Sequence, residues 1–208
     1  MTEPTASEPT ASEPTADPFG QAKYQLRFEW GFAGARAVAS DADIVVWVDA
    51  VGPLSAPAED QPSVATALAA SVAVGAAIIE GGLTNATATA RWILDEQVRL
   101  GRRAMVSIIA AGEPRSGGGT RFAVEDLLAA GAVIDALGVL GIDYTSPEAA
   151  AACASFTGLR GAVAHLLTAS ASGQAVLAAG SDRATIAAAG RLDTVETVTV
   201  LRVAAAQE

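Results

Sequence analysis

Five acidic residues follow apolar segments at the points where buried strands are expected to end or a helix to begin. Asp49 follows "IVVWV", Glu80 follows "AII", Glu113 follows "SIIAA", and Glu125 and Asp126 open a long apolar helix pattern. Ligands of open α/β sheets collect beyond the carboxyl ends of the strands, so these side chains are expected to converge on one crevice. Mg²⁺ takes one or two carboxylates and leaves its other positions to water and substrate phosphate, which favours a magnesium site. Taken singly, each acid is better explained as a solvated side chain or as one paired with a helix dipole.

The segment that connects Glu113 to the helix is a second candidate for chemistry. "GEPRSGGGTR", residues 112–121, is longer than the usual connection between a strand and a helix. Its three consecutive glycines allow backbone N–H groups to approach an anion, and Arg115 and Arg121 could clamp phosphate or sulfonate oxygens. The segment lacks the lysine of the phosphate-loop pattern, and a flexible glycine linker is an equally good interpretation.

Three further polar residues have two interpretations each. Asn85, in "GGLTNATATA", fits a helix N-cap or a side chain that faces a ligand. His165 is the only histidine, and a structural, hydrogen-bonded role is favoured over that of a catalytic base. Cys153 is the only cysteine, so the chain forms no internal disulfide and no cysteine zinc site, and a small buried hydrophobe is expected.

The elements that would position these residues alternate between strands and helices. Strands are expected within 24–30, 44–49, 77–80, 104–113 and 195–203, and helices within 31–39, 61–73, 84–100 and 121–141. The first strand alternates polar and apolar residues, which predicts an edge or antiparallel position. Residues 146–190 are helical without strands and are expected to pack on one side of the sheet. The fold class predicted is an α/β layered sandwich with a mostly parallel or mixed sheet flanked by helices.

Composition bounds the domain organisation. The chain has 208 residues, of which 51% are hydrophobic, and residues 21–208 are expected to form a single α/β domain. Residues 1–20 contain a repeated "SEPTA" unit, whose prolines and polar residues predict a disordered tail.

Composition also bounds the partners. The net charge of −10 argues against a nucleic-acid partner, although a small anionic phosphorylated substrate can still bind where local amides and arginines outweigh it. No apolar run of about 20 residues is present, so no membrane partner is expected. No secretory signal is recognisable either, and a cytoplasmic location follows as an expectation. The oligomeric state stays open, and the alanine-rich surface would suit a homo-oligomer.

Several segments, taken in order and spacing, resemble the 2-phosphosulfolactate phosphatase family, in particular its actinobacterial version. They are "RFEWGFAGARAVASDADIVVWVDAV", "GLTNATATARWI", "SIIAAGE", "RFAVEDLLAAGAVIDAL", "SPEAAAACASF" and "ASGQAVLAAG". The similarity covers most of residues 24–203, and the stretch from Asn85 to Ala130 is its most specific part.

The resemblance implies an α/β phosphatase fold and Mg²⁺-dependent hydrolysis of 2-phosphosulfolactate to sulfolactate and inorganic phosphate. The resemblance extends to Asp49, Asn85, Glu113, Arg121, Glu125 and Asp126. With it, the residues expected to be catalytic are Asp49, Glu125 and Arg121, and the expected metal ligands are Asp49, Glu125 and Asp126. The residues expected to bind substrate are Asn85 and Glu113, together with Arg115, which is added from the glycine-rich segment alone.

The sequence also departs from the family pattern. After the aspartate at position 49 the family carries a threonine-rich run, where this chain has "AVGPLSAPA". The family's glycine-rich glutamate segment and its "NGT"-type loop are expected between Pro57 and Ala76, where this chain has a polar linker and an alanine helix. The alternative to a phosphatase is therefore a catalytically inactive relative that acts as a binding or assembly protein.

Overall fold

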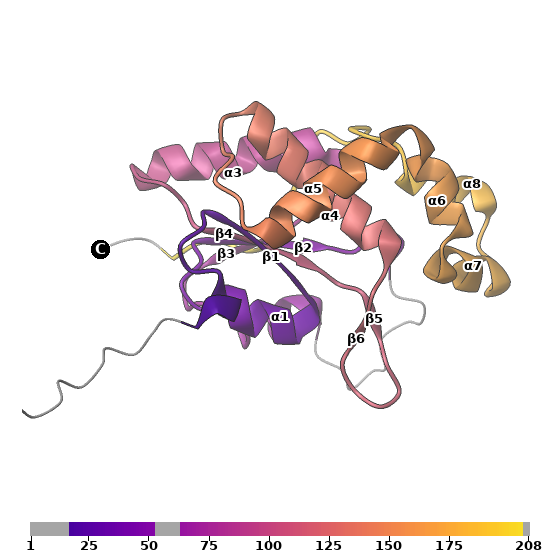
Figure 1. Cartoon of the computed structure of the whole chain (residues 1–208), viewed down its shortest axis with the longest axis horizontal. Helices are drawn as coiled ribbons and strands as arrows, with labels where there is room; N and C mark the ends of the chain where they lie inside the picture. The colour runs from indigo at the N-terminus through magenta and orange to yellow at the C-terminus, as the bar shows by residue number, and fades with distance from the viewer. Residues whose placement is uncertain (1–16, 53–62, 206–208) are drawn as a thin grey trace, which may run out of the picture.

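The computed structural model describes residues 17–52 and 63–205, and its centre is a five-stranded sheet (Figure 1). The strands of this sheet are β1 (Leu26–Trp30), β2 (Ile44–Val48), β3 (Ala77–Glu80), β4 (Val106–Ala110) and β7 (Thr199–Arg202). Their order is β1-β4-β2-β3-β7; the first four are parallel, and β7 pairs antiparallel with β3. Two short strands, β5 (Glu113–Pro114) and β6 (Thr120–Arg121), form a separate hairpin.

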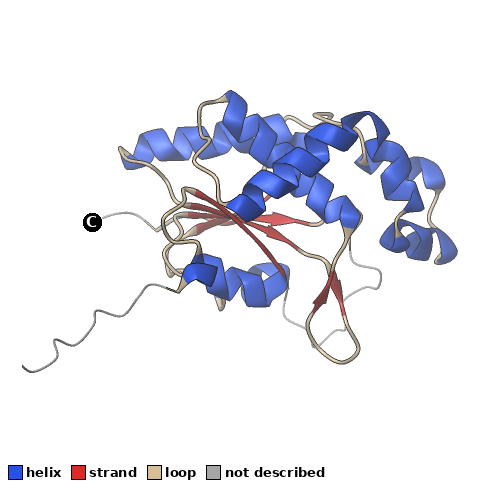
Figure 2. Cartoon of the chain, viewed as in Figure 1, coloured by secondary structure: helices blue, strands red, loops and turns tan. Residues whose placement is uncertain are grey.

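Helices cover both faces of the sheet, as Figure 2 shows. The helices are α1 (Gly31–Val38), α2 (Val64–Ala69), α3 (Ala86–Leu100), α4 (Val124–Val139), α5 (Pro147–Leu159), α6 (Val163–Ala169), α7 (Ala171–Ala178) and α8 (Arg183–Ala189). Short 3-10 turns occur at η1 (Pro18–Gly20), η2 (Leu83–Asn85) and η3 (Arg160–Ala162). The predicted α/β sandwich with a mixed, mostly parallel sheet is therefore confirmed.

The strands are apolar on both sides because both sides are covered. Val46 and Ile108 belong to the core beneath α3, α4 and α5, whereas Val45 and Ile109 belong to a second core with α1 and α2. Every residue of β2 is buried. A parallel sheet covered on both faces reads as continuous hydrophobic runs, which explains why these strands were recognisable in the sequence.

β1 is an edge strand, as its alternating pattern predicts, but its polar face is not solvated. The side chain of Arg27 is 1% exposed. Its guanidinium donates hydrogen bonds to the carbonyls of Tyr24, Ala22 and Val38, and it pairs with the carboxylate of Asp41. These bonds satisfy a charge that burial would otherwise penalise.

The amino-terminal part of the described chain is ordered earlier than the sequence predicts. Residues 1–16 of the expected tail lie outside the described residues, but Pro18–Gly20 form a 3-10 turn capped by the side chain of Asp17. The buried Gln21 side chain then donates to the carbonyl of Phe28, and its amide oxygen accepts from the Phe28 N–H. Residues 17–20 of the expected tail therefore form a turn directly before Gln21, whose side chain is bonded to β1.

The segment 146–190 is helical without strands, as predicted, but only part of it lies on the sheet. α5 packs on α4 and β1, while α6, α7 and α8 extend beyond the end of this layer (Figure 1). By length and composition alone the run Pro147–Ala178 would suffice to cross a membrane. This is weak support for a membrane span, because the run is interrupted by an extended residue at Ser170.

Candidate active site

Four parallel strands end side by side, and α4 begins at the same edge of the sheet. β4 leads into the β5–β6 hairpin, β2 leads to Asp49, and β3 ends at Glu80. The first turn of α4 contributes Glu125 and Asp126, both of which are buried. Acidic side chains from segments that are distant in the sequence thus lie at the same edge of the sheet, beyond the carboxyl ends of its parallel strands.

Asp126 joins the ends of two neighbouring strands. One carboxylate oxygen accepts the N–H of Ala50, after β2, and the other accepts the N–H of Gly112, after β4, both at 2.8 Å. Burial raises the pKa of Asp126 to about 7, while the two amides oppose the rise and the charges of Asp49 and Glu125 add to it. Since both oxygens are engaged by backbone groups, Asp126 holds the edge of the sheet together.

Asp49 remains accessible from solvent and has acidic neighbours. Its Oδ1 accepts the N–H of Gly52 at 2.8 Å. Burial by surrounding protein atoms raises the pKa of Asp49, the Gly52 amide opposes this, and the charges of Glu125 and Glu80 raise it further. Asp49, Glu80 and Asn85 line a cavity of about 430 Å³. A group of carboxylates that repel one another beside a cavity is suited to a cation or a proton.

Glu113 and Arg121 face each other across the β5–β6 hairpin. They are paired residues of the antiparallel register. Burial raises the pKa of Glu113, the Ser172 hydroxyl opposes this rise, the charges of Asp49 and Glu125 add to it, and Arg121 opposes it. Glu113 therefore belongs to the same electrostatic cluster as Asp49 and Glu125, and the charge of Arg121 opposes theirs.

The glycine-rich segment forms the turn of the β5–β6 hairpin. The N–H of Arg115 donates to the carbonyl of Gly119, and the N–H of Gly118 donates to the carbonyl of Arg115. Gly118 and Gly119 have φ values of +88° and +84°, a region that L side chains rarely adopt. The glycines are thus needed for the turn, and Arg115 lies exposed on the projecting hairpin (Figure 1).

Asn85 holds backbone segments next to the cavity. Its Oδ1 accepts the N–H of Gly82 at 2.9 Å, and its Nδ2 donates to the carbonyl of Thr197 at 3.3 Å. Both ends of its amide thus have backbone partners, but neither bond caps α3. Asn85 also lines the cavity, which is consistent with the interpretation that its side chain faces a ligand.

The carboxylates at this edge are the kind of ligand that Mg²⁺ prefers, but they do not form a complete set of protein ligands around a metal position. Among residues 17–52 and 63–205, no three acidic, histidine or cysteine side chains are arranged to hold a metal ion. Mg²⁺ commonly keeps several waters and uses one or two carboxylates with a substrate phosphate, so Asp49 and Glu125 supply a fitting donor set. Asp126 offers less, because backbone N–H groups occupy both of its oxygens.

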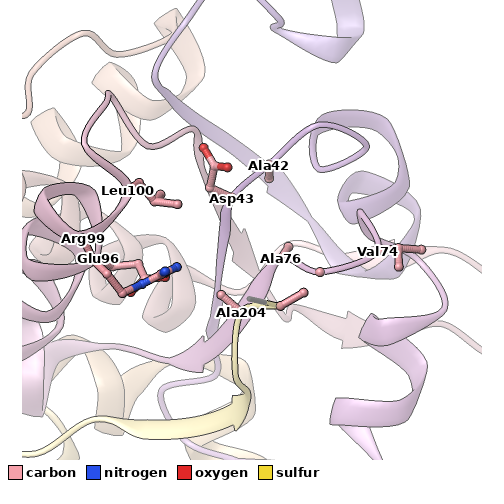
Figure 3. A pocket seen from close by; sticks show the side chains of 10 residues that line it. Ala42, Asp43, Val74, Ala76, Glu96, Arg99, Leu100 and Ala204 are labelled. Carbon is pink, nitrogen blue, oxygen red and sulfur yellow. The ribbon is translucent and has the colours of Figure 1, made fainter. Parts of the chain in front are cut away.

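A second cavity, of about 200 Å³, lies at the opposite end of the strands (Figure 3). Its charged side chains already have partners. Arg99 pairs with Glu96, and Asp43 accepts two bonds from Arg102 and one from the N–H of Met105. Its polar groups therefore satisfy one another, in contrast with the repelling acids at the other edge.

Sequence reasoning missed two residues near the candidate site. Asp193 accepts the N–H and the hydroxyl of Thr87 at 2.7 Å each and so closes the start of α3. Ser172, in the first turn of α7, is buried, and its hydroxyl opposes the rise in the pKa of Glu113. No local pattern marks either residue, because both reach the site from segments that are distant in sequence. His165 is exposed rather than a buried structural residue, and Cys153 is half-buried.

The fold and this edge define a class: a three-layer α/β protein with a carboxylate-lined crevice beyond the carboxyl ends of its parallel strands. The chain belongs to the 2-phosphosulpholactate phosphatase family, whose sequence profile matches residues 63–203. The match begins after β2, so Asp49 lies outside it, whereas the other predicted site residues lie inside. No curated protein sequence matches the chain.

Proposed function

We propose that this protein hydrolyses the phosphate ester of 2-phosphosulfolactate in a Mg²⁺-dependent reaction. The observation that carries the proposal is the gathering of Asp49, Glu113 and Glu125 at one edge of the sheet, within reach of each other's charge, in a chain of this family. Such a cluster repels a phosphate unless a cation lies between them, which is the arrangement that a metal-dependent phosphatase requires.

The roles of the residues follow from their surroundings. Asp49 and Glu125 would hold the cation, because the charge of Glu125 acts on the Asp49 carboxyl group and a cation between the two carboxylates would relieve their repulsion. When bound, Mg²⁺ would polarise the phosphoryl group and lower the pKa of a water molecule. Asp126 would keep the two strand ends at a fixed separation through its bonds to Ala50 and Gly112.

The anionic substrate needs positive partners near the acids. Arg121, which pairs with Glu113 in the hairpin, would donate to phosphoryl oxygens as negative charge develops. Asn85 lines the adjacent cavity, where its amide and neighbouring backbone groups would contact the remainder of the substrate. Arg115, exposed on the same hairpin, would add a second positive charge for the substrate.

The alternative is an inactive relative that binds a partner. It is favoured by the engagement of Asn85 and Asp126 with backbone groups of the protein itself. Residues 53–62, on which part of the departure from the family falls, lie outside the described residues.

The decisive experiment measures phosphate release from 2-phosphosulfolactate with Mg²⁺ and with a chelator. We expect Mg²⁺-dependent release by the wild type, and a fall of at least about a hundredfold in kcat for Asp49→Ala, as for loss of a main electrostatic contributor to the transition state. Asp143→Asn, a change at an exposed residue, is the matched control and should retain activity.

Two results would contradict the proposal. Equal activity of Asp49→Ala would remove Asp49 from the site. Folded wild-type protein without turnover on this substrate or on a panel of phosphomonoesters would favour the inactive relative. In that case a sharp dimer in sedimentation, with no thermal response to Mg²⁺, would direct the search to partners.

A further inference from the structure

The segment that connects α8 to β7 lies on the surface and forms part of the wall of the larger cavity. We call this segment, residues 191–198, the strap. Residues 191–197 are all exposed, and in the strap only Val198 packs against the hydrophobic core. Val195 and Thr197 nevertheless line the cavity of about 430 Å³ at the candidate site. Because apolar burial contributes little to its position, the strap depends on polar contacts.

These polar contacts join the strap to residues 83–87, which end in the first turn of α3. Strap N–H groups donate to two carbonyls, Thr87 donates twice to a strap carboxylate, and Asn85 donates to a strap carbonyl. The bonds are Asp193 N–H to Leu83 O at 3.0 Å, Val195 N–H to Thr84 O at 2.8 Å, Thr87 N–H to Asp193 Oδ1 and Thr87 Oγ1 to Asp193 Oδ2 at 2.7 Å each, and Asn85 Nδ2 to Thr197 O at 3.3 Å. Residues 83–85 line the same cavity, so the bonds set the separation between two segments of its wall.

Asp193 supplies the only strap side chain among these bonds. Its carboxylate accepts both an N–H and a hydroxyl from Thr87, and hydrogen bonds to an ionised acceptor are stronger than those between neutral groups. The carboxylate also lies at the amino-terminal end of α3, where the helix dipole favours negative charge. The other bonds use backbone groups of the strap, so Asp193 is the position at which a change of side chain can release it.

We propose that the strap is a substrate-binding wall and that Asp193 is its positioning residue. The two bonds between Asp193 and Thr87, which we call the latch, fix Val195 and Thr197 against the part of the substrate that does not react. Releasing the latch leaves the acidic residues that follow β2 and open α4 in place, since neither segment belongs to the strap. The effect on substrate affinity rests on the proposed phosphatase function, whereas the latch itself does not.

The first measurement is the kinetics of phosphate release from 2-phosphosulfolactate by variants of the latch. Asp193→Gly removes the carboxylate and tolerates the φ of +52° at this position, and it should raise KM about fivefold while kcat changes less than about twofold. Asp193→Asn can accept the Thr87 N–H and donate to the hydroxyl oxygen, so its KM should stay within about twofold of the wild type. Glu196→Ala, at an exposed residue of the strap, is the matched control.

The second measurement is hydrogen exchange of the strap amides, which needs no activity. In Asp193→Gly the Val195 N–H should exchange about tenfold faster, because the latch no longer holds it against Thr84. A carboxylate that only capped α3 would change exchange in the first turn of that helix and leave the strap as in the wild type. Thr87→Val, which removes the hydroxyl and keeps the shape, should act in the same direction without adding to Asp193→Gly, and Thr87→Ser should resemble the wild type.

Three results would overturn the proposal. They are unchanged exchange of the Val195 N–H in Asp193→Gly; in an active enzyme, a loss that falls on kcat with KM unchanged; and an equal loss in Asp193→Asn, which retains the bonds of the latch. If the wild type shows no turnover, the proposed function fails. The exchange measurement then decides the latch by itself, since faster exchange confined to the strap supports it and any other pattern overturns it.

Discussion

At the residue scale, neighbouring carboxylates of α4 have different surroundings. Asp126 accepts two backbone N–H groups and bridges the ends of β2 and β4. Glu125, beside it in the chain, has no such bonds in the described structure, and its charge raises the pKa of Asp49 and of Glu113. A buried acid held by two amides is structural, whereas acids that repel one another are available for chemistry.

Replacing Asp126 by asparagine tests the structural role through the pH dependence of stability. Burial raises the pKa of Asp126 from 3.8 to about 7, so between these values the folded protein keeps a proton that the unfolded chain has lost. The unfolding free energy of the wild type should therefore fall as pH rises from about 4 to about 7, and Asp126→Asn should lack this contribution. Urea unfolding at several pH values measures it.

The same substitution has a cost that does not depend on pH. Asparagine offers one acceptor oxygen where two backbone N–H groups need partners, so one N–H is left unpaired, at about 1–3 kcal/mol. The exposed Asp143→Asn is the control and should reproduce the wild-type slope. A wild-type slope in Asp126→Asn would show that Asp126 does not titrate as described.

At the element scale, the segment that precedes β7 contacts the first turn of α3 and accepts its free N–H group. The segment before β7 places Asp193 on Thr87, in the first turn of α3. The N–H groups of Asp193 and Val195 also donate to the carbonyls of Leu83 and Thr84. A remote carboxylate thus takes the place of a local N-cap, since Asn85 makes no side-chain cap bond to α3.

Three substitutions of Asp193 should separate its carboxylate from its backbone. Asp193 has a φ of +52°, which asparagine and glycine tolerate and alanine does not. We expect Asp193→Asn to lose the least stability, Asp193→Gly to lose about 1 kcal/mol for the cap, and Asp193→Ala to lose the most. Thermal or urea unfolding gives the order, with the exposed Glu196→Ala as control. Equal losses would mean that the backbone conformation contributes nothing.

At the scale of the whole molecule, helices cover both faces of the sheet. The ends of the strands are therefore the part of the sheet that polar side chains and ligands can reach. The cores on the two faces are closed by α1 and α2 on one side and by α3, α4 and α5 on the other. The acids at the carboxyl ends add to a net charge of −10. A bound cation would relieve part of this repulsion, and ligand binding to the folded state would raise its stability.

Mg²⁺ should therefore stabilise the wild type against heat. At ten times its dissociation constant the gain is about 1.4 kcal/mol, equivalent to a rise of a few degrees in Tm. Asp49→Ala and Glu125→Gln should abolish the rise, and Asp143→Asn should keep it. NaCl of equal ionic strength controls for screening of the net charge. The same rise in both site variants would place the cation elsewhere.

The sequence by itself determined the strands, the order of the elements and the family. Segments such as "IVVWV" are buried on both faces, so their hydrophobicity is continuous and visible without a structure. The acids after β2 and β3 were predictable for the same reason, because parallel strands end at one edge. The glycine run left an anion-binding segment and a flexible linker equally open, and the structure has a hairpin there.

Only the tertiary structure decided which acids are structural and which distant residues reach them. Asp126 and Glu125 are adjacent in the chain, and no feature of the sequence distinguishes their roles. In the structure β2 and β4 end beside α4, so the N–H groups of Ala50 and Gly112 donate to Asp126 and give it a structural role. Ser172 and Asp193 arrive from helices and loops far along the chain. Such contacts depend on how layers pack, and no local spacing of residues records them.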